Sequence, residues 1–223
     1  MTEFTTWRSL VDGAEISDIP DSVVAQYVAD EQASTSTWED QIGSADLTGS
    51  ATEVVSDAIN GFDALRFQPL NSDEMDTDGF TVSERHAIAV VYEQQSNLDS
   101  GGHYFDAGPN ADRHDVQDDS GGQYRGTRGA DAKDFAANTT DPVLILWDCK
   151  PGDDDWYIND SIEFSGDTGD NPLDGLTVAN RRDLDVSDFG MEADYAEIVI
   201  YDNPTDSDIT SEIDRLTSKY GLV

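Results

Sequence analysis

Three acidic side chains near the C-terminus are spaced in a way that is compatible with catalysis by paired carboxylates. Glu192, Asp194 and Glu197 form the pattern E-x-D-x-x-E within MEADYAE. Residues two apart on a strand share a face, and a β-bulge can bring a residue five positions on to that face as well. Retaining glycosidases use two carboxylates about 5–5.5 Å apart, one as the nucleophile and one as the acid/base. Hydrolysis of a glycoside by Glu192 and Glu197 is therefore one hypothesis.

Acidic loops offer oxygen ligands to a hard cation. SGDTGDNPLDG contains Asp167, Asp170, Asn171 and Asp174, and GDDDW contains Asp153 to Asp155. Ca²⁺ takes six to eight oxygen ligands, often from alternate loop positions, which favours Ca²⁺ over Mg²⁺. Neither loop has the spacing of a helix-loop-helix calcium site, and acidic loops are usually just solvated. We expect no cofactor, with Ca²⁺ or Mg²⁺ as the alternative.

The histidines and the cysteine show no metal-binding spacing. His86, His103 and His114 are dispersed along the chain without a zinc pattern. Cys149 is the only cysteine, which excludes a disulfide within the chain. In VLILWDCK it is predicted to be a small buried hydrophobic residue. No phosphate-binding loop and no dinucleotide fingerprint occurs.

Charge dominates the composition. The chain has 48 Asp and Glu against 12 Lys and Arg, a formal net charge of -36 over 223 residues. Molar salt shortens the Debye length to roughly 3 Å and removes most of the resulting repulsion. We therefore predict adaptation to molar salt, with disorder as the alternative. The charge excludes nucleic acid and anionic membranes as direct electrostatic partners.

The apolar pattern predicts a packed β domain. Turn residues separate the strands at NG (60–61), DG (78–79), GPNAD (108–112), PGDDD (151–155) and SGDTGDNPLDG (165–175). Many short alternating strands of this kind favour an antiparallel sandwich or jelly roll. Predicted strands cover residues 23–29, 51–56, 63–68, 86–94, 102–107, 142–149, 155–163, 175–180 and 194–201.

One helix is predicted, at the C-terminus. Thr205 can cap it and Asp208 completes a capping-box-like pair, while Gly221 suits the C-terminal cap. Its apolar residues fall on one face, which we expect to pack on a sheet: Ile209, Ile213, Leu216 and Tyr220.

The N-terminus is predicted to be an attachment segment. Residues 1–20 precede the strand pattern and form an arm ahead of a domain at 21–223, with apolar contacts from Phe4, Trp7, Leu10 and Val11. The start lacks the basic and apolar regions of a signal peptide, and no apolar run approaches the ~20 residues of a membrane span. We expect neither an export signal nor membrane insertion.

Motifs in a fixed order give the chain a family resemblance. It resembles the concanavalin A-like lectin/glucanase superfamily, most closely the laminin-G-like jelly-roll module of surface and phage proteins. The family patterns W-x-D, N-G-x-x-A-x-R-F and a closing A-E-(apolar)3-Y-D with a helix ending K-Y-G match over about residues 20–223. The matching residues are Trp38, Asp40, Asn60, Gly61, Ala64, Arg66, Phe67, Ala196, Glu197, Tyr201, Asp202 and Lys219 to Gly221. The hairpin Asn159 also matches, but Asp160 replaces the usual glycine.

The resemblance implies a two-sheet jelly roll with the C-terminal helix, and it weakens the case for catalysis. Glu197 is already the acid of the closing motif, and in the family's glucanases the catalytic strand lies mid-chain, followed by aromatic cleft strands. Chance three-acid matches are also common among 48 acids. We expect no enzymatic activity. Trp38, Trp147 and Trp156 are expected in the core rather than as sugar platforms.

The expected function is that of a non-enzymatic protein on the surface of a virus particle. Modules of this type mostly act outside cells, and a virion assembled in the cytoplasm of a halophilic host would reach the outside without an export signal. The roles are capsid decoration, turret or tail fibre. Partners would be other virion proteins, copies of itself, and host-surface glycans or glycoproteins. The alternatives are a carbohydrate-binding module of a halophilic cell-surface protein and a glycoside hydrolase using Glu192 and Glu197.

Overall fold

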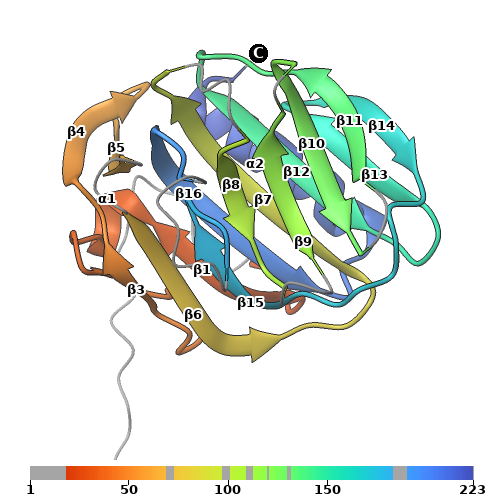
Figure 1. The fold of residues 1–223 in the computed structure, drawn as a ribbon. Coiled ribbons are helices and arrows are strands. Elements are labelled where there is room, and N and C mark those ends of the chain that lie inside the picture. Colours follow the sequence, from red (N-terminus) through yellow and green to blue (C-terminus); the bar gives the residue numbers. More distant parts are fainter. Residues whose placement is uncertain are drawn as a thin grey trace, which may run out of the picture.

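Two antiparallel sheets pack face to face. The computed structural model describes residues 19–68, 73–96, 101–108, 113–119, 121–129, 132–182 and 190–222. Figure 1 looks onto sheet B, with sheet A behind it and the C-terminal helix α2 (Asp206–Tyr220) behind sheet A. This arrangement confirms the predicted antiparallel two-sheet β-sandwich with a C-terminal helix.

Sheet A is built around the long strand β16. Its strands are, in spatial order, β14 (Ser161–Gly166), β13 (Asp154–Ile158), β12 (Val143–Cys149), β7 (His86–Gln94), β16 (Ala193–Asp202), β5 (Phe62–Phe67) and β4 (Glu53–Ile59), with β1 (Val23–Val28) also paired to β16. A four-residue helix, α1 (Ala29–Gln32), follows β1.

Sheet B holds the middle of the chain. Its strands are, in spatial order, β11 (Ala132–Ala137), β10 (Gln123–Arg128), β9 (His114–Asp118), β8 (His103–Asp106), β15 (Asp174–Val178), β6 (Glu74–Thr81), β3 (Leu47–Ser50) and β2 (Thr37–Trp38).

The core lies between the sheets and is rich in aromatic rings. Trp38, Trp147 and Trp156 are each 0% exposed, which confirms their predicted place in the core. The rings of Trp147 and Trp156 lie 4.3 Å apart, and Phe135 lies 4.0 Å from Trp156. Cys149 is also fully buried in this core, as predicted.

Helix α2 covers the outer face of sheet A. Its predicted apolar face, Ile209, Ile213, Leu216 and Tyr220, packs against the outward residues of β7, β12 and β16. Thr205 and Asp208 form the predicted capping box, and Gly221 ends the helix with a φ of 62°. The local sequence therefore specified both ends of the helix and its buried face.

Several strand predictions were wrong, mostly in sheet B. The Asp78-Gly79 pair lies inside β6 instead of forming a turn, because residues 78–80 form a bulge opposite Gly175 of β15. The segment predicted as one strand at 155–163 is two strands joined by a turn, and Asn159, at a φ of 54°, lies in that turn as the family resemblance implied. Strands β2, β3, β6, β9, β10 and β11 and helix α1 were not predicted.

The predicted arm falls almost entirely outside the described residues. Of residues 1–20 the structure describes Ile19 and Pro20, and Ile19 packs against the cluster between sheet A and α2. The division into an arm at 1–20 and a domain at 21–223 stays a prediction. In the described part of the chain, no helix is long and apolar enough to cross a membrane.

Candidate functional site

The outer face of sheet B carries polar side chains. On β9, Val116 joins the core, so Asp115 and Gln117 point outward by strand alternation. Asp115 lies opposite Asp106 of β8 and Thr127 of β10, so these three share the outer face. Helix α2 covers part of the outer face of sheet A, over β7, β12 and β16, so we take the outer face of sheet B as the candidate surface for a ligand.

Asp115, His103 and Arg113 form a charged cluster on this face. His103 Nδ1 lies 2.9 Å from Asp115 Oδ2, and Arg113 donates to the same oxygen. Asp115 and His103 are buried, whereas the Arg113 side chain is 24% exposed. Burial lowers the pKa of His103 more than Asp115 raises it, so the ring is neutral at pH 7. The buried carboxylate therefore holds the Arg113 guanidinium at the surface.

Asp106 has an unusual protonation behaviour. Burial, and then the charge of Asp115, raise the pKa of Asp106 to about 7, although Arg113 and the backbone amides of Gly108 and Arg182 act in the opposite direction. Near neutral pH the Asp106 carboxyl is therefore present in both protonated and ionised forms. The Arg182 amide donates to its Oδ2 at 3.2 Å.

Partly exposed side chains that can donate hydrogen bonds lie beside these buried acids. Arg125 is 34% exposed and donates to Asp134 at 2.7 Å and to Asp119 at 3.1 Å. Gln117 lies opposite Arg125 in the sheet register and 3.5 Å from Arg113. We call Arg113, Gln117 and Arg125 the arginine row. Its geometry suits a ligand with several acceptor oxygens, because each guanidinium is pre-oriented by an acid.

Sequence reasoning missed the arginine row. The alternation in HDVQD at 114–118 was the available signal, but this stretch follows a polar loop and was not predicted as a strand. The grouping also depends on pairings between β8, β9 and β10 that no local pattern states.

Glu197 lies beneath α2 and not in a cleft. Arg215 lies 2.6 Å from its Oε1, while Lys219 at 2.7 Å and the Tyr220 hydroxyl at 2.9 Å reach its Oε2. Burial by itself raises the pKa of Glu197, but the ion pairs with Arg215 and Lys219 outweigh it and lower the pKa to about 2. A carboxylate that is fully buried and bound by these cations fastens the helix to sheet A.

The other two acids of the 192–197 pattern also have partners. Asp194 forms a two-pronged pair with Arg66, at 2.7 and 2.6 Å, and Glu192 accepts a hydrogen bond from Ser96 at 2.7 Å. The structure gives the Glu192 and Glu197 pair no shared open cleft among the residues that it describes.

The acidic loops hold their carboxylates apart. Asp167 accepts from the Gly169 amide and Asp170 from the Gly152 amide, while Asp154 is buried against Arg128. Among the described residues, no three acids converge on a common point for a cation.

Three residues set aside as dispersed do meet in space. His86, His114 and Cys149 place one ligand atom each within 4.8 Å of one another, and all three are buried. The remaining histidine, His103, belongs to the cluster with Asp115. Sequence spacing missed the first group because the two sheets bring together residues that are far apart in the chain.

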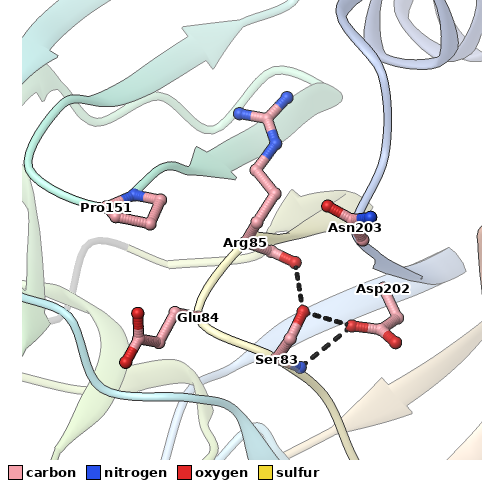
Figure 2. Close-up of a pocket in the computed structure, with 6 residues that line it drawn as sticks. All are labelled: Ser83, Glu84, Arg85, Pro151, Asp202 and Asn203. Atoms are coloured by element: carbon pink, nitrogen blue, oxygen red, sulfur yellow. Dashed lines mark hydrogen bonds between the residues drawn. The ribbon is translucent and has the colours of Figure 1, made fainter.

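An open depression of about 630 Å³ lies near that group. Figure 2 shows that Ser83, at its rim, hydrogen-bonds to Asp202 (2.6 Å from its Oγ) and to the Arg85 carbonyl (2.9 Å), while the Arg85 side chain extends away from Ser83. The Arg85 guanidinium pairs with Asp148 at 3.0 Å. The polar groups of the depression bind one another, so they do not by themselves indicate a ligand.

The comparisons with known proteins support the fold. No family model matches the chain, and no curated protein matches it either. Solved structures do match: a Trypanosoma rangeli sialidase in complex with sialic acid has a TM-score of 0.67 at 14% identity, over 95% of this chain and 35% of the other.

Two toxin structures match equally well. The binding domain of botulinum neurotoxin serotype D/C has a TM-score of 0.67 at 13% identity, over 88% of this chain and 52% of the other. A botulinum neurotoxin type C structure, whose title concerns cell entry through two ganglioside molecules, has a TM-score of 0.66 at 15% identity and covers 88% and 51%. This chain spans between a third and about half of the chains that it matches. Likeness at such low identity shows a shared lectin-like β-sandwich fold.

Proposed function

We propose that this chain is a non-enzymatic glycan-binding β-sandwich that binds acidic sugars through the arginine row. The observation that carries the proposal is the Arg113 guanidinium, which is partly exposed on the outer face of sheet B and held there by the buried Asp115. Planar guanidinium groups bind carboxylates with two parallel hydrogen bonds, a geometry that an acidic sugar can meet.

The comparisons lend the proposal further support. The titles of the matching structures name sialic acid for the sialidase and ganglioside molecules for the neurotoxin. Sialic acid is a sugar that carries a carboxylate. The net charge of -36 would repel such a ligand in dilute buffer, but molar salt screens that repulsion and leaves the directed hydrogen bonds.

The absence of catalysis is part of the proposal. Asp106 and Asp115 are a carboxyl pair with an acid of raised pKa, which is the chemistry that a glycosidase needs. However, Asp106 is 1% exposed and Asp115 is 0% exposed, so a glycosidic bond has no access to them. We expect bound glycans to be recovered intact after prolonged incubation.

The charge-conserving change Arg113→Lys tests the site. Lysine keeps the charge beside Asp115 but loses the two-pronged geometry, so we expect the Kd for acidic glycans to rise at least about tenfold, or roughly 1.4 kcal/mol. Binding would be measured on a glycan array and by calorimetry in molar salt.

Arg66→Lys is the matched control. Arg66 is also 24% exposed and also pairs with a buried aspartate, but it lies on sheet A. Its change should leave the Kd within about twofold, since it removes no contact to the ligand. Equal losses in both variants, or no glycan bound by the parent, would contradict the proposal.

A narrower proposal concerns where the domain works. We place it on the surface of a virus particle of a halophilic host, as a capsid decoration, turret or tail fibre, with other virion proteins and copies of itself as partners. Its support is the salt-adapted charge of -36. Mass spectrometry of purified particles should find the chain at many copies. A chain found only in cell envelopes would favour the alternative, a carbohydrate-binding module of a halophilic cell-surface protein.

A further inference from the structure

Three potential metal ligands meet at one end of the sandwich, apart from the arginine row. His86 is the first residue of β7 and Cys149 the last of β12, and the sheet register places them directly opposite each other. His114 is the first residue of β9 in the other sheet. Their strands alternate so that all three side chains point between the sheets, as Cys149 and Val116 show by their place in the core.

Two of the three distances within the group match those around a metal ion, and all three ligand atoms lie within 4.8 Å of one another. The Nε2 atoms of His86 and His114 lie 3.5 Å apart, and Cys149 Sγ lies 3.6 Å from the same His114 Nε2. Metal bonds of about 2.0 Å to nitrogen and 2.3 Å to sulfur give nitrogen–nitrogen distances of about 3.3–3.5 Å and nitrogen–sulfur distances of about 3.5–3.7 Å for tetrahedral to trigonal angles. Without a metal, both contacts can be hydrogen bonds, one between the two rings and one between the Cys149 thiol and His114 Nε2.

The protonation state of His86 prepares it as a ligand. Its Nδ1 lies 2.7 Å from the Ser83 carbonyl, which can only accept, so the single proton of the neutral ring is on Nδ1. The lone pair on Nε2 then faces His114. A backbone carbonyl that orients the outer nitrogen is the usual support of a metal-binding histidine.

The electrostatic surroundings favour a monovalent ion. Arg128 lies near the group, and its pair with Asp154 at 2.9 Å is completely buried and neutral as a whole. A thiolate with Cu⁺ is also neutral, whereas Zn²⁺ would leave a net positive charge in the core beside Arg128. Thiolate is a soft donor that Cu⁺ selects, and imidazole also suits copper.

We propose that His86, His114 and Cys149 form a buried three-coordinate site for Cu⁺ that fastens sheet A to sheet B. The proton of the Cys149 thiol is released to solvent when the metal binds, so the complex carries no net charge. The open depression of Figure 2 lies beside the group, since the backbone carbonyl of Ser83 at its rim contacts His86 and that of Glu84 accepts a hydrogen bond from Arg128.

The test titrates the whole chain with Cu⁺ against a chromogenic Cu⁺ chelator, under anaerobic conditions in molar salt. We expect one ion per chain. Cys149→Ala should weaken binding by more than about 100-fold, since loss even of an outer-shell partner of a metal ligand costs 10- to 100-fold. His103→Gln is the matched control, because His103 is a similarly buried histidine outside the group. The affinity of this variant for Cu⁺ should equal that of the unmodified chain.

X-ray absorption on the unmodified chain gives a reading that does not depend on the folding of any variant. We expect two nitrogen ligands and one sulfur ligand around copper. No retained Cu⁺, equal retention by Cys149→Ala, or a copper shell without sulfur would overturn the site. Binding of Zn²⁺ that is tighter than that of Cu⁺ would overturn the choice of ion.

Discussion

Replacing Gly126 with alanine is expected to destabilise the fold by about 3 kcal/mol, at the upper end of the range for overpacked cores. A methyl group on Gly126 would lie 1.2 Å from Trp156 Cη2. The Trp156 ring has no room to move, because Trp147 lies 4.3 Å and Phe135 4.0 Å from it. For a chain of this size the change corresponds to a fall in Tm of about 6–12 °C. Chemical denaturation in molar salt measures it.

A double-mutant cycle assigns the effect to this contact. In a Trp156→Leu background the alanine at position 126 should cost much less, because the smaller side chain leaves space for the methyl group. Gly152→Asn is the control, since nothing lies within 4 Å of Gly152 and its φ of 76° suits asparagine. If the two changes in the free energy of unfolding simply add, the cost of the alanine does not come from its contact with Trp156.

Glu197→Gln is expected to remove about 3 kcal/mol, the cost of losing one partner from a buried ionic cluster. The neutral amide would leave Lys219 and the Tyr220 hydroxyl without the carboxylate that they share. Gln26 also donates to this carboxylate, at 2.7 Å, so the change also weakens a contact from β1. We expect α2 to detach from sheet A in this variant. Circular dichroism and chemical denaturation would measure the change.

Glu197 also controls how the free energy of unfolding falls at acid pH. The folded pKa of Glu197 is lowered to about 2, below its unfolded value of about 4.3, so ionisation stabilises the fold above that unfolded value. This contribution is complete above about pH 5 and is lost as the pH falls from about 4.3 to 2. Glu197→Gln should flatten stability across that window, whereas the exposed Glu163→Gln should not. An unchanged acid limb in Glu197→Gln would contradict the assignment.

Helix α2 and the turns of sheet A were predictable because their signals are local. Thr205, Asp208 and Gly221 specify the ends of the helix through contacts within a few residues. Asn60 and Gly61 adopt φ values of 51° and 90° in the turn between β4 and β5, as their types predict. Strands β7, β12 and β16 are seven to ten residues long and hold apolar runs rich in β-branched and aromatic residues, as expected for strands buried on both faces.

Six of the eight strands of sheet B were not predicted, because these strands lack a regular apolar pattern. The β10 sequence QYRGTR holds one large apolar residue, Tyr124, and places Gly126 where another would be expected. That glycine makes room for Trp156 from the opposite sheet, so its reason is visible only across the core. The Asp78-Gly79 pair has the residues of a turn, yet it lies in a bulge of β6, because the residues on either side of the bulge, Thr77 and Thr81, both pair with β15.

The sequence by itself determined the fold class, the capped helix, the buried tryptophans and the acidic charge, since each follows from composition or from neighbours along the chain. Only the tertiary structure decided which acids and histidines meet. It placed Glu197 under α2, Asp115 beside His103 and Arg113, and Cys149 against His114, across 35 residues of chain. The physical reason is that strand register and the packing of the two sheets bring distant residues together. Neither the register nor the packing can be inferred from the residue spacing of a single motif.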